Sequence, residues 1–176
     1  MIYLDYNATT PIDKDVAEAM LPYIYGNYGN PSSNHKMGVI AKKSIEKARG
    51  QVAELINCSP EEIIFTSGGS ESNNMVIKGV AHTLKHNGNH IITTKVEHPA
   101  VLNPCYYLKK LGYRVSYLNV DKYGIVNLSE LESLITDETI LVTVMHANNE
   151  TGTLQPIKDI SERRKRHNVL LHTDAS

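Results

Sequence analysis

The chain has 176 residues, with 18 Lys and Arg against 19 Asp and Glu, so its formal net charge is −1. This length is enough for one domain with a sizeable core. The balanced charge, with no basic arm and no acidic tail, argues against nucleic-acid or anionic-membrane binding as the main activity.

The N-terminal residues, Met1-Ile2-Tyr3-Leu4-Asp5, lack the charged segment and apolar core of a secretory signal. No apolar run approaches the roughly 20 residues that span a bilayer. The two cysteines, Cys58 and Cys105, form neither a CxxC pair nor a disulfide framework. We therefore expect a cytoplasmic, reducing location and two inert structural thiols.

The predicted elements alternate between helix and strand from about residue 36 onward. Apolar residues recur at helical spacing over residues 37–56 and 75–84, and a β-prone run occupies residues 63–66 between them. Strands are then predicted at 91–94, 114–118, 140–145 and 169–173, and helices at 101–111 (with Pro104 in the first turn), 128–135 and 157–167. This alternation predicts βαβ units and therefore an α/β fold with a mostly parallel sheet between helices.

Two charged clusters have simple structural explanations. His82, His86 and His90 lack a cysteine or carboxylate at ligand spacing, so we predict a solvated helix end there rather than a metal site. The basic run at residues 163–166 fits the cationic last turn of a helix better than a nucleic-acid patch.

The first chemical signal is the stretch at residues 66–74, Thr-Ser-Gly-Gly-Ser-Glu-Ser-Asn-Asn, between a predicted strand and a predicted helix. Gly68 and Gly69 allow a ligand to approach the backbone, and the helix start offers unpaired N–H groups. Ser70 can add a hydroxyl donor as well as cap the helix. The pattern is neither a P-loop nor a GxGxxG fingerprint, which leaves two interpretations: another type of phosphate site, or an ordinary turn.

Three more polar segments follow predicted strands, where open α/β sheets place their ligands. They are Glu97-His98-Pro99, residues 146–152 and residues 172–175. Each alone is compatible with a structural loop. Four polar features at one edge of one sheet indicate a binding site.

Six motifs in this order resemble the N-terminal half of cysteine desulfurases, which belong to the class-V branch of the fold-type I pyridoxal-phosphate enzymes. The resemblance runs from residue 2 to residue 176. The motifs are Leu4-Asp5-Tyr6-Asn7-Ala8-Thr9-Thr10-Pro11, Gly29-Asn30-Pro31-Ser32-Ser33-Asn34-His35, residues 66–74, Glu97-His98, Asn148-Asn149-Glu150-Thr151-Gly152 and His172-Thr173-Asp174-Ala175.

This resemblance implies a three-layer, mostly parallel sheet, that of the fold-type I transferase large domain, incomplete at its C-terminal end. Residues 1–13 would form an N-terminal arm lining the active-site entrance, and residues 14–176 a partial large cofactor-binding domain.

The resemblance also implies pyridoxal 5′-phosphate as the cofactor and assigns its contacts. Gly69 and Ser70 would hold the phosphate, where the family more often has Ala-Thr. His98, the implied catalytic residue, would stack on the pyridine ring and assist proton transfer. Asn149 would bond the ring's phenolic oxygen, and Asp174 would pair with the ring nitrogen. The substrate entrance would be lined by Asn7, Ala8, Thr9, Thr10, Asn30 and His35.

Other family residues would follow Ser176: a glutamine, the Schiff-base lysine of a Ser-x-His-Lys segment, a nucleophilic cysteine and a carboxylate-binding arginine. Residues 33–36 read Ser-Asn-His-Lys, but they follow Asn30 and so match the entrance loop instead. We therefore expect a truncated or split portion that is inactive in isolation. The strand edge after Asp174 would be unpaired, so we expect the chain to be unstable without a complement.

The implied activity converts L-cysteine to L-alanine and passes sulfur as a persulfide to an iron–sulfur scaffold, a tRNA-thiolation partner or another acceptor protein. The enzyme would be a homodimer or work with a complementing chain, and neither nucleic acid nor membrane is expected as a partner. Two alternatives remain open. One is a non-catalytic module that binds cofactor or associates with a subunit, and the other is a related lyase such as selenocysteine lyase.

Overall fold

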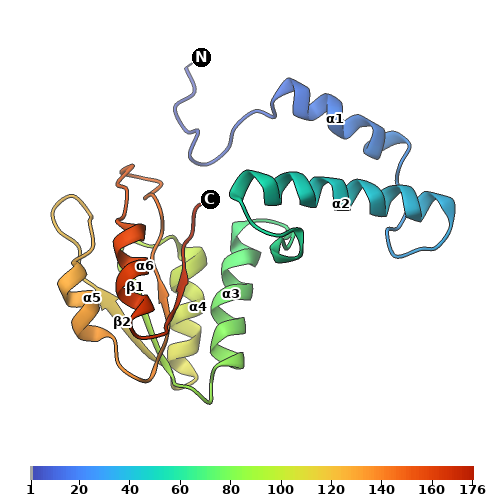
Figure 1. Ribbon diagram of the computed structural model, residues 1–176. Coiled ribbons are helices and arrows are strands. Elements are labelled where there is room, and N and C mark those ends of the chain that lie inside the picture. Colours follow the sequence, from blue (N-terminus) through green and yellow to red (C-terminus); the bar gives the residue numbers. More distant parts are fainter. Residues whose placement is uncertain (1) are drawn as a thin grey trace. The chain divides into compact units, whose positions relative to one another are not determined.

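A computed structural model describes residues 2–176, and the chain divides into two compact units (Figure 1). One unit ends at Phe65, and the other is Thr66–Ser176. Within the described residues, no helix is both long enough and apolar enough to cross a membrane.

The described part of the unit that ends at Phe65 contains α1 (Lys14–Tyr25), α2 (Lys36–Ile56) and the short 3₁₀ turn η1 (Pro60–Glu62). The helix predicted at residues 37–56 is confirmed as α2, which ends where Asn57 takes a left-handed conformation, φ 55°. The α1 helix was not predicted. None of its residues is buried, so its apolar side chains do not mark a core-facing stripe.

The strand predicted at residues 63–66 is wrong. A strand needs a neighbouring strand to pair its backbone N–H and C=O groups, and residues 63–66 join no ladder in the described structure. The guanidinium of Arg49 instead donates to the Ile63 carbonyl oxygen and lies 5.0 Å from the centre of the Phe65 ring. The side chains of Ile64 and Phe65 remain 66% and 49% exposed.

The Thr66–Ser176 unit contains a four-stranded sheet in the order β2-β1-β3-β4, and every neighbouring pair is parallel. This confirms the predicted α/β fold. The strands are β1 (His90–Thr94), β2 (Arg114–Leu118), β3 (Thr139–Thr143) and β4 (Leu170–His172).

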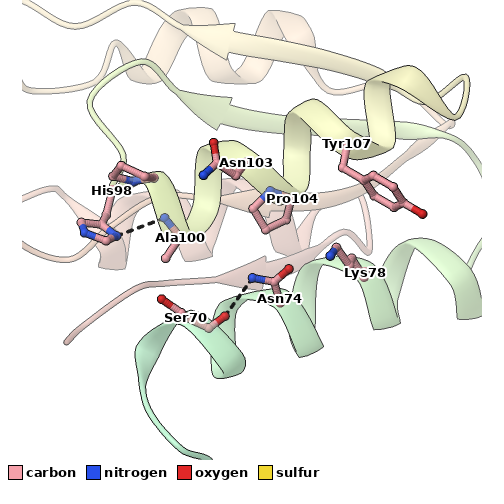
Figure 2. A pocket seen from close by; sticks show the side chains of 9 residues that line it. Ser70, Asn74, Lys78, His98, Ala100, Asn103, Pro104 and Tyr107 are labelled. Atoms are coloured by element: carbon pink, nitrogen blue, oxygen red, sulfur yellow. Dashed lines mark hydrogen bonds between the residues drawn. The ribbon is translucent and has the colours of Figure 1, made fainter.

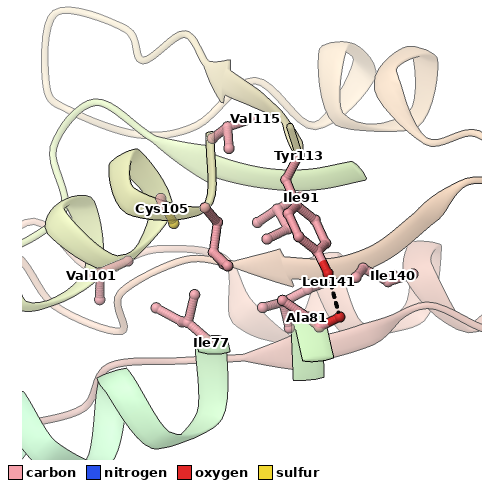
Figure 3. Close-up of a cluster of buried hydrophobic side chains, with 10 residues drawn as sticks. Ile77, Ala81, Ile91, Val101, Cys105, Tyr113, Val115, Ile140 and Leu141 are labelled. Carbon is pink, nitrogen blue, oxygen red and sulfur yellow. Dashed lines mark hydrogen bonds between the residues drawn. The ribbon is translucent and has the colours of Figure 1, made fainter. Parts of the chain in front are cut away.

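Helices cover both faces of this sheet and make three layers, as predicted (Figure 1). Ile91 and Leu141 face α3 (Gly69–Thr83) and α4 (Pro99–Lys110), in the cluster drawn in Figure 3. The next residues along the same strands, Ile92 and Val142, belong to a second cluster with α5 (Leu128–Leu134) and α6 (Ile157–Lys165). Successive strand residues point to opposite faces, so a strand covered on both faces is buried along its whole length, as β1 and β3 are.

Pro104 does not lie in the first turn of its helix, so that prediction is wrong. The helix begins earlier, because His98 caps it and Pro99 occupies its first position, where a missing N–H costs nothing. Pro104 therefore lies inside α4 and removes the donor that would otherwise reach the Ala100 carbonyl.

The predicted explanation holds for the basic run, whereas the predicted solvated helix end is wrong for His90. The run at residues 163–166 forms the basic last turn and end of α6, and both Arg163 and Arg166 pair with Glu132 of α5. His90 is buried at the start of β1, where its ring bonds the hydroxyls of Thr139 and Ser116, each at 2.8 Å. Burial lowers the pKa of His90 to about 4, and the nearby Arg114 charge adds to this.

Candidate functional site

The carboxylate of Asp174, just after β4, is held by hydrogen bonds from helix α3 and from the residue two positions later in the chain. Asn73, a buried residue of α3, donates from Nδ2 to Asp174 Oδ2 at 2.8 Å. Ser176 donates to Oδ1 from its backbone N–H at 3.1 Å and from its hydroxyl at 2.7 Å. Both carboxylate oxygens therefore accept hydrogen bonds from residues that fix their direction.

These bonds decide the charge of Asp174. Burial acts to raise its pKa, but the bonds from Ser176 and Asn73, together with the charge on His172, outweigh burial and lower the pKa below its usual value of 3.8. Asp174 is thus ionised at neutral pH. The nearby His172 ring bonds Thr143 Oγ1 through Nδ1 at 2.8 Å. Burial lowers the pKa of His172, and the Asp174 charge only partly opposes this.

The start of α3 lies next to this carboxylate. Gly68 occupies the capping position with φ 152°, and Gly69 and Ser70 form the beginning of the first turn. A Cβ on Gly69 would lie 2.8 Å from the Ser176 hydroxyl oxygen, so a larger residue would displace the hydroxyl that bonds Asp174. Gly69 is therefore part of the packing around Asp174.

Ser70 does not cap α3, contrary to one of its predicted roles. Gly68 is the capping residue, and no side chain of the described residues makes a capping bond there. Glu71 instead accepts from the backbone N–H and the hydroxyl of Ser67, just before the helix, at 2.7 and 2.6 Å. These bonds lower the pKa of Glu71. The Ser70 hydroxyl is left to its second predicted role, that of a donor at the helix start.

A pocket of about 320 Å³ lies between α3 and α4 and has Ser70 and His98 in its lining (Figure 2). His98 caps α4 by accepting from the Ala100 N–H at Nδ1, 3.1 Å away, so a neutral His98 ring carries its proton on Nε2. Along the pocket, Lys78 places its Nζ 4.9 Å from the centre of the Tyr107 ring. The lining is therefore polar and carries a positive charge.

The segments that follow β1 and β3 are joined by two side chains. Glu97 Oε1 accepts from the Thr94 hydroxyl and from the Met145 N–H, each at 2.9 Å. Asn148 donates from Nδ2 to the Val96 carbonyl oxygen at 3.0 Å. The strand ends that carry His98 and the residues 146–152 are thereby held side by side.

Glu97 is itself an unusual carboxyl group. It is 5% exposed, and its Oε2 is buried with no hydrogen-bond partner in the described part of the chain. Burial raises its pKa from 4.5 to about 7, and the bonds from Met145 and Thr94 only partly oppose this. The Asp174 charge raises it further.

Asn149 lies in the loop after β3, where its Nδ2 donates to Glu150 Oε1 at 3.1 Å. The preceding Asn148 organises that loop, because its Oδ1 accepts from the backbone N–H groups of Glu150 and Thr151 at 3.0 and 2.9 Å. The predicted contact of Asn149 with a cofactor stays a prediction.

The six residues predicted at the substrate entrance all belong to the unit that ends at Phe65. A turn closed by bonds to the Asp5 carbonyl oxygen contains or directly precedes four of them, Asn7, Ala8, Thr9 and Thr10. Asn30 closes a second turn by accepting from the Ser32 N–H at 2.9 Å. His35 caps α2. A side chain on Gly38 would collide with the Ser33 carbonyl, so this loop packs tightly against the start of α2.

The prediction of an inert thiol is confirmed for Cys105. Its side chain is fully buried in the core against α3, and burial together with the Glu97 charge raises its pKa to about 12. A thiol nucleophile acts as the thiolate, so this environment disfavours reaction.

Comparison with known proteins gives the family. Residues 2–176 match the family described as "Aminotransferase class-V". The chain belongs to the class-V aminotransferases.

Curated relatives include cysteine desulfurases IscS from Dictyoglomus turgidum, 52% identical over 174 residues, and from Methanosarcina thermophila, 50% identical over 174 residues. Each alignment covers 99% of this chain but only 44% and 43% of the relative, so the chain spans less than half their length.

Two solved structures support the fold assignment. A NifS-like protein superimposes with a TM-score of 0.96 at 46% identity, covering 99% of this chain and 48% of that one. A structure described as SspA in complex with cysteine gives 0.94 at 41% identity, covering 98% and 50%. These similarities confirm the predicted resemblance to the N-terminal half of cysteine desulfurases.

Three residues that organise the site were given no role from the sequence: Asn73, Glu97 and Asn148. Their sequence signal was present, since each lies in a segment already recognised as polar and close to a strand or helix end. Nothing in the segments themselves shows which oxygen or nitrogen each side chain contacts, because those partners come from strands far away in the chain.

Proposed function

We propose that this chain supplies the cofactor-binding portion of a pyridoxal-phosphate-dependent cysteine desulfurase. The observation that carries the proposal is the ionised Asp174 carboxylate, fixed by Asn73 of α3 and Ser176 next to the helix start that bears Gly69 and Ser70. Support comes from relatives named as cysteine desulfurases and from the similar structure of SspA in complex with cysteine.

The residues present fit pyridoxal 5′-phosphate. The start of α3 offers N–H groups without intrahelical partners and the Ser70 hydroxyl, which suit a phosphate. His98, in the same pocket, offers an aromatic face for a pyridine ring. Asp174, ionised at neutral pH, suits a protonated ring nitrogen. A phosphate, a ring and a ring nitrogen thus each have a matching group.

In this proposal each residue has one task. Gly69 and Ser70 hold the phosphate, and His98 lies on the ring face and moves protons at Nε2, the nitrogen left available by its cap. Asn149 orients the ring's phenolic oxygen, and Asp174 keeps the ring nitrogen protonated. When bound, the cofactor supplies an electron sink that stabilises negative charge on the substrate.

The complete protein would take L-cysteine, release L-alanine and pass the sulfur to an iron–sulfur scaffold or another acceptor protein. We propose a cytoplasmic homodimer, or a pair with a complementing chain, in which residues 1–13 form an arm at the entrance and residues 14–176 a partial large domain. Asn7, Ala8, Thr9, Thr10, Asn30 and His35 would line that entrance. This is supported by the alignment with the Dictyoglomus turgidum relative, which covers 99% of this chain but only 44% of the relative.

A chimera tests this function. The chain would be joined to the remaining C-terminal part of the Dictyoglomus turgidum relative, and alanine release from L-cysteine would be measured. We expect the chimera to release alanine, the same chimera with Asp174→Asn to lose at least about a hundredfold in rate, and the isolated chain to release none. A correctly folded, cofactor-loaded chimera that is inactive on cysteine would contradict the proposal.

A further inference from the structure

We propose that Glu97 is the positioning residue of His98, because its buried carboxyl group fastens the segment between β1 and α4 to the chain just beyond β3. The inference deepens the proposed function, because His98 is the residue that would face the cofactor ring. Its test below includes one measurement that needs no cofactor.

The geometry gives Glu97 this role. His98 follows it directly, and the imidazole is fixed on its C-terminal side by the capping bond to Ala100. On the N-terminal side, the position of the segment depends on the Glu97 bond to the Met145 N–H and on the parallel bond from Asn148 to Val96. Cutting the Glu97 bond therefore removes one of these two bonds to the chain beyond β3.

The surroundings of Glu97 favour the protonated form. Its Oε2 is buried and has no partner within residues 2–176, and an unpaired buried carboxylate is costly enough to take up a proton. The groups facing it are the Thr94 hydroxyl of β1, the Met145 amide beyond β3, the Cys105 thiol of α4 and the Asp174 carboxylate beyond β4. None of these is a cation, and Asp174 repels a second negative charge.

This assignment separates two substitutions. Glu97→Gln keeps an oxygen for the Thr94 and Met145 donors and resembles the protonated acid in charge and shape. Glu97→Ala removes the acceptor and leaves the Met145 N–H buried and unpaired. Thr93→Val is the matched control. Thr93 is fully buried on β1, next to Thr94, and its hydroxyl has no partner in the described structure.

The cofactor-free measurement follows the backbone amide of Met145 by NMR as a function of pH. In the wild-type chain we expect its resonance to titrate with a midpoint near neutral pH, and in Glu97→Gln we expect this transition to vanish. A wild-type midpoint below about pH 5, the ordinary range for a glutamic acid, would overturn the inference.

The second measurement is the affinity for pyridoxal 5′-phosphate at pH 7. We expect Glu97→Gln and Thr93→Val to bind within about twofold of wild type, and Glu97→Ala to bind about tenfold more weakly. Equal affinity in Glu97→Ala and wild type would refute the positioning role. If neither the wild-type chain nor its chimera with the C-terminal part of the relative binds the cofactor, the proposed function fails, and the Met145 titration still decides the state of Glu97.

Discussion

Asp174 and Glu97 are two acids at the same edge of the sheet, and their environments shift their pKa values in opposite directions. Asp174 accepts three hydrogen bonds over its two oxygens, so its charged form is stabilised despite partial burial. Glu97 accepts two bonds on one oxygen, and its buried second oxygen has no partner among residues 2–176, so burial dominates. The distribution of donors, rather than burial alone, thus decides which of the two acids is charged.

The pKa of Glu97 predicts how stability depends on pH. The folded chain binds the Glu97 proton more tightly than the unfolded chain, so its stabilisation is complete below about pH 4.5 and is lost as pH rises to about 7. Denaturant unfolding should show the wild type losing up to roughly 1.4 kcal/mol per pH unit relative to Glu97→Gln in this window. Parallel curves for the two proteins would refute this. The contribution of Asp174 has the opposite sign and is lost only at pH values below 3.8.

Removing Asn73, the helical hydrogen-bond donor to Asp174, should lower the free energy of unfolding. Asn73→Ala leaves Asp174 Oδ2 without its buried donor, and we expect a loss of about 1–3 kcal/mol in the free energy of unfolding. The adjacent Asn74 gives a matched control, because its Nδ2 donates to the exposed Ser70 carbonyl oxygen. Asn74→Ala should therefore cost about 0.5 kcal/mol or less. Equal losses in the two variants would remove the special role of Asn73.

At the scale of elements, apolar periodicity in the sequence predicted the four strands of the sheet and the helices that cover it. These elements form where the apolar residues of a local stretch pack into one or both of the hydrophobic clusters on the two faces of the sheet. Residues 63–66 have the same apolar character but no neighbouring strand, so composition alone gave the wrong element. Helix α1 was missed although Val16, Met20 and Ile24 recur at helical spacing, and the structure shows that it buries none of its side chains. The motifs predicted the residues of the proposed site, whereas the pairings Asn73–Asp174 and Glu97–Met145 depend on tertiary packing.

One hydrogen bond joins two elements of the sheet unit in Figure 3 and gives a further prediction. The buried Tyr113 hydroxyl, just before β2, donates to the Ala81 carbonyl near the end of α3 at 2.7 Å. Tyr113→Phe should lower the free energy of unfolding by about 1 kcal/mol or more, because the carbonyl is left buried and unpaired. Tyr123→Phe, at a side chain that is 65% exposed, should change it by less than about 0.5 kcal/mol. If both losses are equally small, the Tyr113 bond does not support α3.

At the scale of the whole molecule, many large apolar side chains of the unit that ends at Phe65 are exposed. The most exposed of those on or after its helices include Tyr25, Tyr28, Leu55, Ile56 and Ile64, each at least 59% exposed. In the other unit, β2 and β4 are the edge strands of the described sheet. Soluble monomers rarely expose so much apolar surface, and open strand edges invite pairing with other chains.

We therefore predict that the isolated chain associates. Light scattering coupled to size-exclusion chromatography should show an apparent mass that rises with concentration, and Leu55→Gln combined with Ile64→Gln should reduce this rise. A monomer at all concentrations with a single cooperative unfolding transition would contradict the prediction.

The central claim is that Asp174 completes a cofactor site built on the start of α3. Calorimetric titration of pyridoxal 5′-phosphate into the chain tests it most directly, with Asp174→Asn as the comparison because that change keeps the shape of the side chain and removes its charge. The account predicts saturable binding of about one cofactor per chain and at least about tenfold weaker binding in Asp174→Asn. Absence of saturable binding by the folded chain, or equal affinity in Asp174→Asn, would contradict it.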